Sequence, residues 1–363
     1  MVDRGFGLEL EATYGDTTVT KSNFDPDFWN QADDVDFNLG DEPVVKSGGS
    51  RMNKRARAGI MKPTGSTSAD ADLQQLAWYF RGFLDNYVCT TGDTPATGHT
   101  QTYIHEYYGG EGKELPSFRG IAVYDMLKKY LYGLLCDGMK LEVSDESMTV
   151  GADWIYKTEK AGIIGSSGET FTRPDELTRE GLFIMFYDVS VFLGTQTVST
   201  VTSPKPLDGV STAFSFEGKN NHDVDKTIGL GSRYPQKRAL AGKRENTLSI
   251  TTTLTSDTVR SILDAQYGEV GALEPSSCKL LQLPLELHVA HCEDSDISLQ
   301  ITFPKCTVRV EYDMSGVDTV EATLTLDTLG SGTVTLADET TEVTTDMYVK
   351  LVNYQEELEI PSS

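Results

Sequence analysis

Short stretches in which apolar and polar residues alternate recur along the chain. Between Thr247 and Leu254, Leu248, Ile250 and Leu254 lie on one side of an extended strand, and threonine and serine lie on the other. The stretches Ser211–Glu217 and Glu321–Asp327 alternate in the same way. A period of two with one polar side is typical of antiparallel sheets that pack on one face and meet water on the other. The pattern predicts a chain that is mainly β-strand.

A further alternating stretch places Val308, Val310 and Tyr312 opposite Thr307 and its polar neighbours. Threonine and valine are common throughout these stretches, and both suit strands. The polar sides consist of serine, threonine and acidic residues. We therefore expect sheets whose exposed face is hydroxyl-rich and negatively charged.

Two segments have the spacing of helices. Apolar residues at Leu73, Leu76, Ala77 and Phe80 follow the i, i+3, i+4, i+7 rule, which predicts a helix over 73–80 with one buried face. A second helix is predicted over 256–263, where serine and aspartate at its start are helix N-cap signals. One helix covering part of each apolar sheet face predicts an α+β, mainly β fold, a β-sandwich or open barrel.

One segment occurs twice. Residues 49–59 read GSRMNKRARAG, and residues 231–242 read GSRYPQKRALAG, about half the chain further on. Each copy is followed by a strand-like stretch and then a predicted helix, and Gly138–Val143 resembles Cys306–Glu311 in its strand pattern. Matches in the same order at a long period indicate a tandem domain duplication rather than a short-period solenoid. The predicted domains are residues 1–172 and 173–363.

Long segments rich in glycine and charge separate the predicted strands. Residues 12–49 and 218–246 are interpreted as extended loops or arms, and residues 158–181 as the linker between the copies. The second copy is then expected to start near Gly181, with a first strand over 189–193. Loops longer than about fifteen residues in compact domains are usually functional or disordered, and two at corresponding places favour a function shared by both copies.

The chain is strongly acidic. It has 363 residues and a formal net charge of −24, from 31 basic and 55 acidic residues. Bulk charge of this sign repels nucleic acid phosphates, although it also serves simple solubility. Five cysteines without close pairs and the lack of a signal-like leader favour a reducing compartment. No apolar run is long enough to predict a membrane span.

Candidate sites for chemistry are weak. His288, His291 and Cys292 could bind a metal, but on a strand His291 points away from the other two. The clusters Asp33–Asp36 and Glu293–Asp296 lack the spacing of a calcium loop and are interpreted as solvated acidic loops. No nucleophile and base are placed together, so we expect neither an enzyme nor a cofactor.

Concentrated positive charge lies in the two repeated segments. In an acidic chain, such loops suit docking on an acidic surface of another copy, because opposite potentials attract and fix register. The alternative is a pair of solvated loops inherited through duplication. The candidate residues for an inter-subunit or inter-ring contact are Arg51, Lys54, Arg55 and Arg57 in the first segment and Arg233, Lys237, Arg238, Lys243 and Arg244 in the second.

The arrangement resembles the tail tube proteins of tailed bacterial and archaeal viruses. The resemblance rests on Asn220-Asn221, Gly231-Ser232-Arg233, Gly242 and the strand Thr247–Leu254, followed by the predicted second helix. Looser matches in the first half are Gly49–Gly59, Leu73–Phe80 and Leu115–Phe118. Residues 12–45 fit the pattern poorly.

The resemblance implies a structural virion protein without enzymatic activity. In this family six tube domains form a ring whose sheets join into an inner β-barrel, so a chain with two domains would form trimeric, pseudo-hexameric rings. Stacked rings would give a hollow tube that conducts viral DNA without specific binding. Implied partners are other copies of the chain and the terminator, baseplate and tape-measure proteins, in a virion tail assembled in the host cytoplasm. The expected lumen-facing residues are Ser215, Glu217, Ser249, Thr251 and Thr253.

Two other functions fit the pattern. A baseplate or distal tail component would use the same domain in a single ring. A carbohydrate-binding β-sandwich would need an exposed aromatic platform, for which Trp29, Tyr107 and Tyr108 are the candidates.

Overall fold

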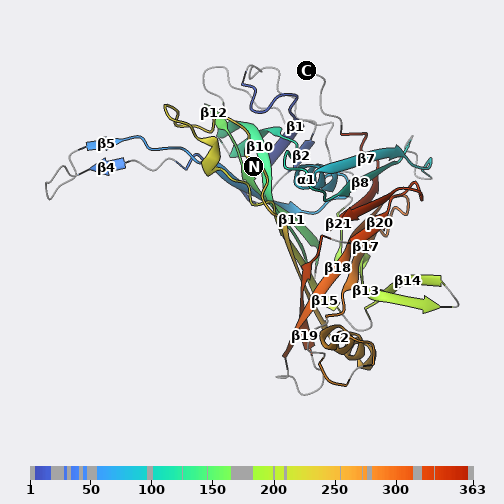
Figure 1. The fold of residues 1–363 in the computed structure, drawn as a ribbon. Helices are drawn as coiled ribbons and strands as arrows, with labels where there is room; N and C mark the ends of the chain where they lie inside the picture. Colours follow the sequence, from blue (N-terminus) through green and yellow to red (C-terminus); the bar gives the residue numbers. More distant parts are fainter. Residues whose placement is uncertain are drawn as a thin grey trace.

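The computed structural model describes residues 5–17, 28–30, 34–40, 44–46, 55–95, 101–124, 126–144, 146–164, 183–198, 201–207, 211–253, 255–271, 273–275, 280–313, 321–330 and 332–358. Within these residues the chain is mainly β-strand with two α-helices, which confirms the expected fold class (Figure 1). The predicted domain boundary at 172/173 lies outside the described residues.

The strands and helices follow the chain in two series. In the N-terminal part they are β1 (Gly5–Leu10), β2 (Phe28–Asn30), β3 (Asp34–Asn38), β4 (Val44–Lys46), β5 (Arg55–Arg57), β6 (Thr64–Asp70), α1 (Leu76–Phe83), β7 (Asn86–Thr91), β8 (Tyr103–Tyr108), β9 (Phe118–Tyr124), β10 (Leu127–Val143), β11 (Met148–Ile155) and β12 (Thr158–Ile163). In the C-terminal part they are β13 (Val189–Val198), β14 (Val201–Pro206), β15 (Ser211–Lys219), β16 (Glu245–Thr253), α2 (Ser256–Tyr267), β17 (Leu283–Ala290), β18 (Ser298–Asp313), β19 (Glu321–Thr328), β20 (Gly332–Thr335), β21 (Glu342–Thr345) and β22 (Tyr348–Asn353).

One antiparallel sheet runs through both parts of the chain, and we call it the main sheet. Its strands pair in the order β3-β6-β11-β10-β15-β16-β19-β18. The β10–β15 pair joins the two parts, with Lys140 opposite Glu217 and Leu141 opposite Phe216. A continuous sheet therefore crosses from one part of the chain to the other.

Two long strands bend and take part in a second layer. Residues Leu127–Leu134 of β10 pair with β9, and β12 and β1 extend this outer sheet, whereas Gly138–Val143 belong to the main sheet. The register shifts between Cys136 and Gly138, where Asp137 forms a β-bulge. A bulge bends a strand and increases its twist, which lets one strand serve two sheets. β18 does the same, with β17 and β22 beside its first half and β19 beside its second.

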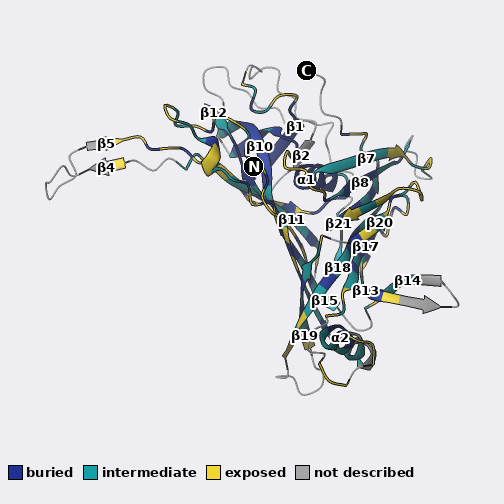
Figure 2. Cartoon of the chain, viewed as in Figure 1, coloured by how far each residue is buried: buried dark blue, intermediate teal, exposed yellow. Residues whose placement is uncertain are grey.

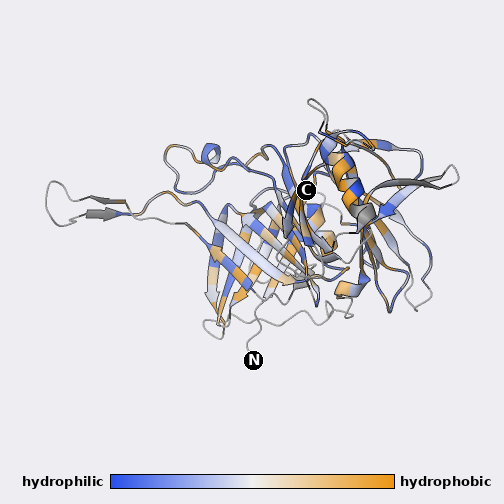
Figure 3. Cartoon of the chain, turned by 90° about the horizontal axis from the view of Figure 1, so that it is seen from below, coloured by the Kyte–Doolittle hydropathy of each residue, from blue (hydrophilic) through white to orange (hydrophobic). Residues whose placement is uncertain are grey.

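The core lies between these layers, where the apolar sides of the strands meet (Figure 2). Trp154 packs against Phe6, Phe118 and Tyr79, with ring centroids 5.6, 6.1 and 6.5 Å away. Its indole N–H donates to Thr67 Oγ1 at 3.0 Å, so the one polar atom of this large side chain is satisfied. The alternation predicted for Thr247–Thr253 and Glu321–Asp327 is confirmed by their burial. Alternating hydrophilic and hydrophobic bands are visible along strands of the fold (Figure 3).

The first helix differs from its prediction. It covers Leu76–Phe83 rather than 73–80, and all eight of its residues are buried instead of one face. Asp72 explains the later start, because its side chain accepts the Gln74 N–H at 2.8 Å and its carbonyl accepts the Leu76 N–H, which forms a turn first. The helix is therefore enclosed by the fold and does not lie along its flank.

Two predicted loops also differ. Residues 12–49 contain β2, β3 and β4, and β3 belongs to the main sheet. The predicted linker 158–181 begins with β12, which pairs with β10, and its remainder from 165 onward lies outside the described residues. The sequence analysis missed these strands because they are short and lie among glycines and charged residues. The predicted loop 218–246 is confirmed over 220–244.

Arg244 links the two parts of the chain at the end of this loop. Its guanidinium donates to Asp85 Oδ1 at 3.0 Å, Asp346 Oδ1 at 3.2 Å and Asn220 Oδ1 at 3.3 Å. The three charged side chains are 11%, 5% and 15% exposed. Buried ion pairs are costly to break because the remaining charges lose their compensation.

Arg244→Ala is expected to lower the free energy of unfolding by about 3 kcal/mol, because it leaves two carboxylates buried without their cation. Urea denaturation followed by tryptophan fluorescence measures this. The matched control is Lys62→Ala, which removes the exposed Lys62–Asp225 pair and should cost less than about 1 kcal/mol. Equal effects of the two substitutions would contradict the assigned role of Arg244.

His105 is a buried neutral histidine in the core. Its Nε2 donates to the Gln355 carbonyl at 2.8 Å, so its Nδ1 accepts from the Tyr87 hydroxyl at 3.0 Å. Tyr87 in turn accepts the Leu358 N–H at 3.0 Å. Burial lowers the pKa of His105 to about 4. At a pH between that value and the ordinary pKa of histidine, His105 is protonated in the unfolded chain and neutral in the folded chain.

Stability is therefore expected to fall as the pH falls below about 6.5, because protonation favours the unfolded chain. Between pH 7 and 5 the wild type should lose about 2 kcal/mol more than His105→Gln, which cannot titrate at this position. Denaturation of both proteins across this range gives the change in unfolding free energy of each. Subtracting one change from the other removes the contribution of the carboxylates, which both proteins share. Parallel stability curves would contradict the assignment.

Candidate functional site: a polar sheet face and two strand edges

The main sheet has one apolar and one polar face. The apolar face packs on the core, and we call the opposite side the polar face. Serine, threonine and charged residues dominate it across all eight strands. Its polar members are Asp34, Asp36, Asn38, Thr64, Ser66, Ser68, Asp70, Thr149, Asp153, Lys140, Glu142, Ser215, Glu217, Lys219, Glu245, Thr247, Ser249, Thr251, Thr253, Glu321, Thr323, Thr325, Asp327, Thr307, Arg309 and Glu311.

Acidic groups outnumber basic ones on the polar face. Among the described residues its basic members are Lys140, Lys219 and Arg309. Lys219 Nζ lies 2.9 Å from Glu217 Oε1, and Arg309 lies 2.6 Å from Asp327 Oδ2. The hydrogen bond from Lys219 lowers the pKa of Glu217 and keeps it ionised. Because the basic residues are few and two of them pair with acids of the same face, the surface retains negative charge.

Part of the polar face is hollowed. A depression of about 220 Å³ lies over β3, β6, β10 and β11 and is lined by Asp34, Ser68, Lys140, Glu142 and Asp153 among others. Within the described residues, Glu142 and Asp153 have no ion-pair partner. The arrangement offers carboxylates and hydroxyls to solvent, without an apolar platform.

The five residues expected to face a lumen lie together on this face. Ser215 and Glu217 are on β15, and Ser249, Thr251 and Thr253 are on the neighbouring β16. Ser215 is opposite Ser249, and Glu217 is opposite Thr247. Their neighbours Phe216 and Leu248 are buried, so the alternation places all five on the polar side.

The two outer edges of the main sheet are β3 and the second half of β18. β3 pairs with β6, and residues 307–313 of β18 pair with β19. No other described strand pairs with either segment on its opposite side. Edge strands present unpaired backbone N–H and C=O groups, which makes them sites for pairing with another chain.

The second repeated segment packs against the N-terminal part of its own chain. The Arg233 side chain donates to the Gly59 carbonyl at 2.9 Å, and Ala239 is buried beside Leu135 and Ile155. The Arg238 side chain lies near the acidic Glu114 and Glu11, and burial lowers its pKa. Lys237 and Lys243 are exposed.

The same loop begins with a tight polar contact to the bulge in β10. The Asn220 side chain donates to the carbonyls of Phe83 and Cys136, and His222 donates its backbone N–H to Asp137 Oδ1 at 2.8 Å. Although burial acts to raise it, the hydrogen bonds from His222 hold the pKa of Asp137 below its ordinary value. The sequence analysis missed this contact, because only the doubled asparagine signalled a special conformation there.

The first repeated segment is placed differently. Arg55 and Arg57 belong to β5, which forms a hairpin with β4 that stands away from the rest of the fold (Figure 1). Arg57 is exposed. Arg51 and Lys54 lie outside the described residues. The structure thus brings part of the second basic group against the fold, whereas the exposed Arg57 of the first group lies on the hairpin.

The acidic segment Asp33–Asp36 is not a loop over its described residues. Asp34 and Asp36 are polar positions of β3 and alternate with the buried Val35 and Phe37. The alternation of this short stretch was the signal for a strand, and the density of aspartates concealed it. No group of three or more candidate metal ligands comes together among the described residues.

The other candidate residues do not form a site. His288 Nε2 lies 2.8 Å from Glu286 Oε2, and His291 Nδ1 accepts the Glu293 N–H. Tyr107 is fully buried and Tyr108 is half-buried, so Tyr107 cannot belong to an exposed aromatic platform, and the Trp29 side chain lies outside the description. None of the described helices has the length and apolarity of a membrane span.

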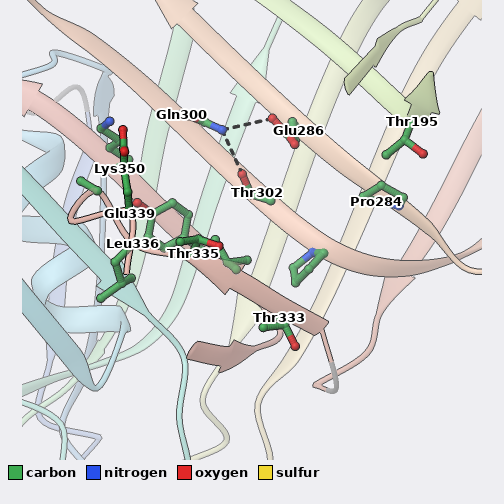
Figure 4. A pocket seen from close by; sticks show the side chains of 14 residues that line it. Thr195, Pro284, Glu286, Gln300, Thr302, Thr333, Thr335, Leu336, Glu339 and Lys350 are labelled. Carbon is green, nitrogen blue, oxygen red and sulfur yellow. Dashed lines mark hydrogen bonds between the residues drawn. The ribbon is translucent and has the colours of Figure 1, made fainter. Parts of the chain in front are cut away.

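A larger hollow of about 520 Å³ lies beneath the β20–β21 hairpin (Figure 4). Its floor is polar, since Gln300 donates to Glu286 Oε2 at 3.1 Å and to Thr302 Oγ1 at 3.4 Å. Thr195, Thr333 and Lys350 complete its rim. The hydrogen bonds among Gln300, Glu286 and Thr302 occupy the polar groups of this floor.

Comparison with known protein families places the chain in one of them. No curated protein matches the chain. The family model for phage tail tube proteins matches residues 3–280, which is well over half of the sequence. With its mainly β fold and a sheet that has one polar face and two edges, the chain belongs to the phage tail tube protein family.

Proposed function

We propose that this chain is a major tail tube protein that forms stacked trimeric, pseudo-hexameric rings. The observation that carries the proposal is the main sheet, which is eight strands wide, acidic on one face and left with one strand edge at each end. Closure of such sheets into a ring removes every exposed edge. Three copies, each carrying two tube domains, would supply the six lobes of one ring.

The same proposal includes a tandem duplication with domains near 1–172 and 173–363. The pairing order β3-β6-β11-β10 is followed by β15-β16-β19-β18, with antiparallel neighbours throughout. In register, Asp34, Ser68, Gly151 and Lys140 form one cross-strand row. The corresponding row is Ser215, Ser249, Thr325 and Arg309.

Backbone conformation supports this register independently. Gly40 and Asn221 both adopt positive φ, at 60° and 51°, and each lies six residues after its member of the row, Asp34 or Ser215. Positive φ is uncommon outside glycine, so its recurrence at matched positions is informative. The register pairs Gly138–Val143 with Thr307–Tyr312, one residue later than similarity of sequence indicated.

The polar face is the proposed lumen lining. Its carboxylates and hydroxyls would repel phosphate and offer few cations for counterion release, so DNA could pass without adhering. Ser215, Glu217, Ser249, Thr251 and Thr253 would line this channel. The opposite face cannot do so, since it forms the core.

The loops would serve contacts between copies. In the chain itself, loop 220–244 lies against the N-terminal part, with Arg238 near acidic side chains and Ala239 in a small apolar cluster. The matching hairpin of β4 and β5, with Arg55 and Arg57, would make a corresponding contact with a neighbouring copy. Stacking contacts of this heterologous kind do not close, so filaments follow. Other tail proteins would end the tube.

The purified protein is expected to form rings of three chains with six similar lobes, and to elongate into tubes at high concentration or with an initiator complex. Negative-stain microscopy and mass photometry measure lobe number and chain number. Single rings that never elongate would favour a distal tail component. Rings with two or six chains would contradict the trimer.

Ser249→Cys is expected to react with a bulky polyethylene-glycol maleimide in the free chain but not in tubes, because the reagent is too wide for a lumen. Thr333→Cys on the exposed strand β20 is the matched control and should react in both states. Both variants are made in a background where serine replaces the native cysteines other than the buried Cys136 and Cys306. Full reactivity of Ser249→Cys in tubes would overturn the lumen assignment.

A further inference from the structure

The β10–β15 pair is an interface between the two parts of the chain, and its register is defined residue by residue. Lys140 lies opposite Glu217, Leu141 opposite Phe216, and Met139 opposite Gly218. Charged residues of opposite sign thus meet on the polar face, and apolar residues meet on the core face. Directly opposed side chains of this kind stabilise a strand pair.

The outer edges of the main sheet carry the same kinds of residue. In the cross-strand rows described above, β18 occupies the place of β10, and β3 occupies the place of β15. Arg309 therefore corresponds to Lys140, and Asp36 corresponds to Glu217. The two edges of one chain match the two sides of its internal interface.

We propose that β3 of one copy pairs antiparallel with residues 307–312 of β18 in the next copy, with Asp36 opposite Arg309. The partner is a second copy of this chain, and the proposal rests on the ring proposed above. Transfer of the internal register then places Val35 opposite Val310, Phe37 opposite Val308, and Asn38 opposite Thr307. Each ring would contain three such interfaces, which alternate with the three internal ones.

Burial on the two edges is complementary. Val35 and Phe37 are 7% and 3% exposed, so the core face of β3 is already covered within the chain. Val308 and Val310 are only half-buried, although the equivalent Met139 and Leu141 are fully buried. The valines are more exposed because no described strand lies beside this part of β18, whereas β15 lies beside β10. Pairing with β3 would cover the valines as β15 covers Met139 and Leu141.

The charged side chains are available for the contact. Arg309 is 70% exposed in its pair with Asp327, so its guanidinium can reach a second carboxylate without leaving the first. Asp36 is exposed on β3. The same register sets Glu311 opposite Asp34, where the internal interface has Glu142 opposite Ser215. Like charges oppose pairing, so Arg309 carries the electrostatic attraction of this interface.

The backbone of β3 is oriented for strand addition. Lys129 Nζ donates to the Phe37 carbonyl at 2.6 Å, which shows that this carbonyl points away from β6 and toward the open edge. A lysine over an edge strand is a common means of protecting it in a free chain. In the ring, the Val308 N–H would take the place of the ammonium. Phe37 and Val308 would then form a hydrogen-bonded pair, which makes Asn38 and Thr307 a closely spaced, non-hydrogen-bonded pair.

The double variant Asn38→Cys/Thr307→Cys tests the register, because Cα atoms in such a pair are close enough for a disulfide. Oxidised assemblies are expected to give covalent dimers and trimers, and nothing larger, on a non-reducing gel. The matched control is Asn38→Cys/Glu311→Cys, whose second cysteine is displaced four residues along the strand and should not crosslink. Both are made in the background described above, in which serine replaces the native cysteines other than Cys136 and Cys306.

Charge exchange tests the central pair. Asp36→Arg and Arg309→Asp are each expected to slow assembly by about tenfold or more, because a like-charge pair replaces an attractive one. The double variant should recover most of the wild-type rate, since it restores opposite charges. Light scattering gives the rates, and denaturation of each variant confirms that the single chain is folded.

The outcomes separate this proposal from the proposed function. Tubes that form from Asn38→Cys/Thr307→Cys without crosslinks would overturn the interface and leave the tube function standing. Crosslinks in the displaced control instead would overturn the register. Covalent trimers in single rings that do not elongate would support the interface and overturn the tube. A wild-type chain that stays monomeric under all conditions would overturn both.

Discussion

Every backbone N–H and C=O group in a sheet needs a hydrogen-bond partner, and this constraint determines how the strands of the molecule are arranged. The β10–β15 pair satisfies it between the two parts of the chain, and the bulge at Asp137 lets β10 pass from the main sheet into the outer layer. The same pairing fixes where Asn220 and Arg244 lie, because loop 220–244 starts where β15 ends. The end of helix α1 lies at the same place, since Asn220 donates to the Phe83 carbonyl.

The constraint stays unmet at both ends of the main sheet. A single chain protects one edge with Lys129 and leaves the valines of the other half-buried. Monomeric proteins commonly cover or shorten such edges, whereas assembling proteins use them. In the ring proposed above, these edges would pair with those of neighbouring copies, and the chain would be one segment of a larger closed sheet.

The two basic segments show how similar sequences can lie in different surroundings. Arg238 and Arg244 meet acidic groups of the N-terminal part, and Arg244 is nearly buried there. Arg57 belongs to a hairpin that stands away from the fold. Their difference follows from position: the strand before the second loop has a neighbour within the chain, and the strand before the first loop is at the edge. Basic residues of similar sequence therefore lie against acidic groups in one loop, whereas Arg57 of the other is exposed.

The sequence by itself determined the mainly β fold, the polar and apolar sides of β15, β16, β18 and β19, and the family resemblance, because a period of two and clear loop segments are local signals. It did not determine β3, whose aspartates concealed a five-residue strand, or the late start and full burial of α1. Strand order, the bulge at Asp137 and the acid partners of Arg244 were decided only by the tertiary structure. They depend on residues far apart along the chain, and alternation specifies which face a residue occupies without specifying its neighbour.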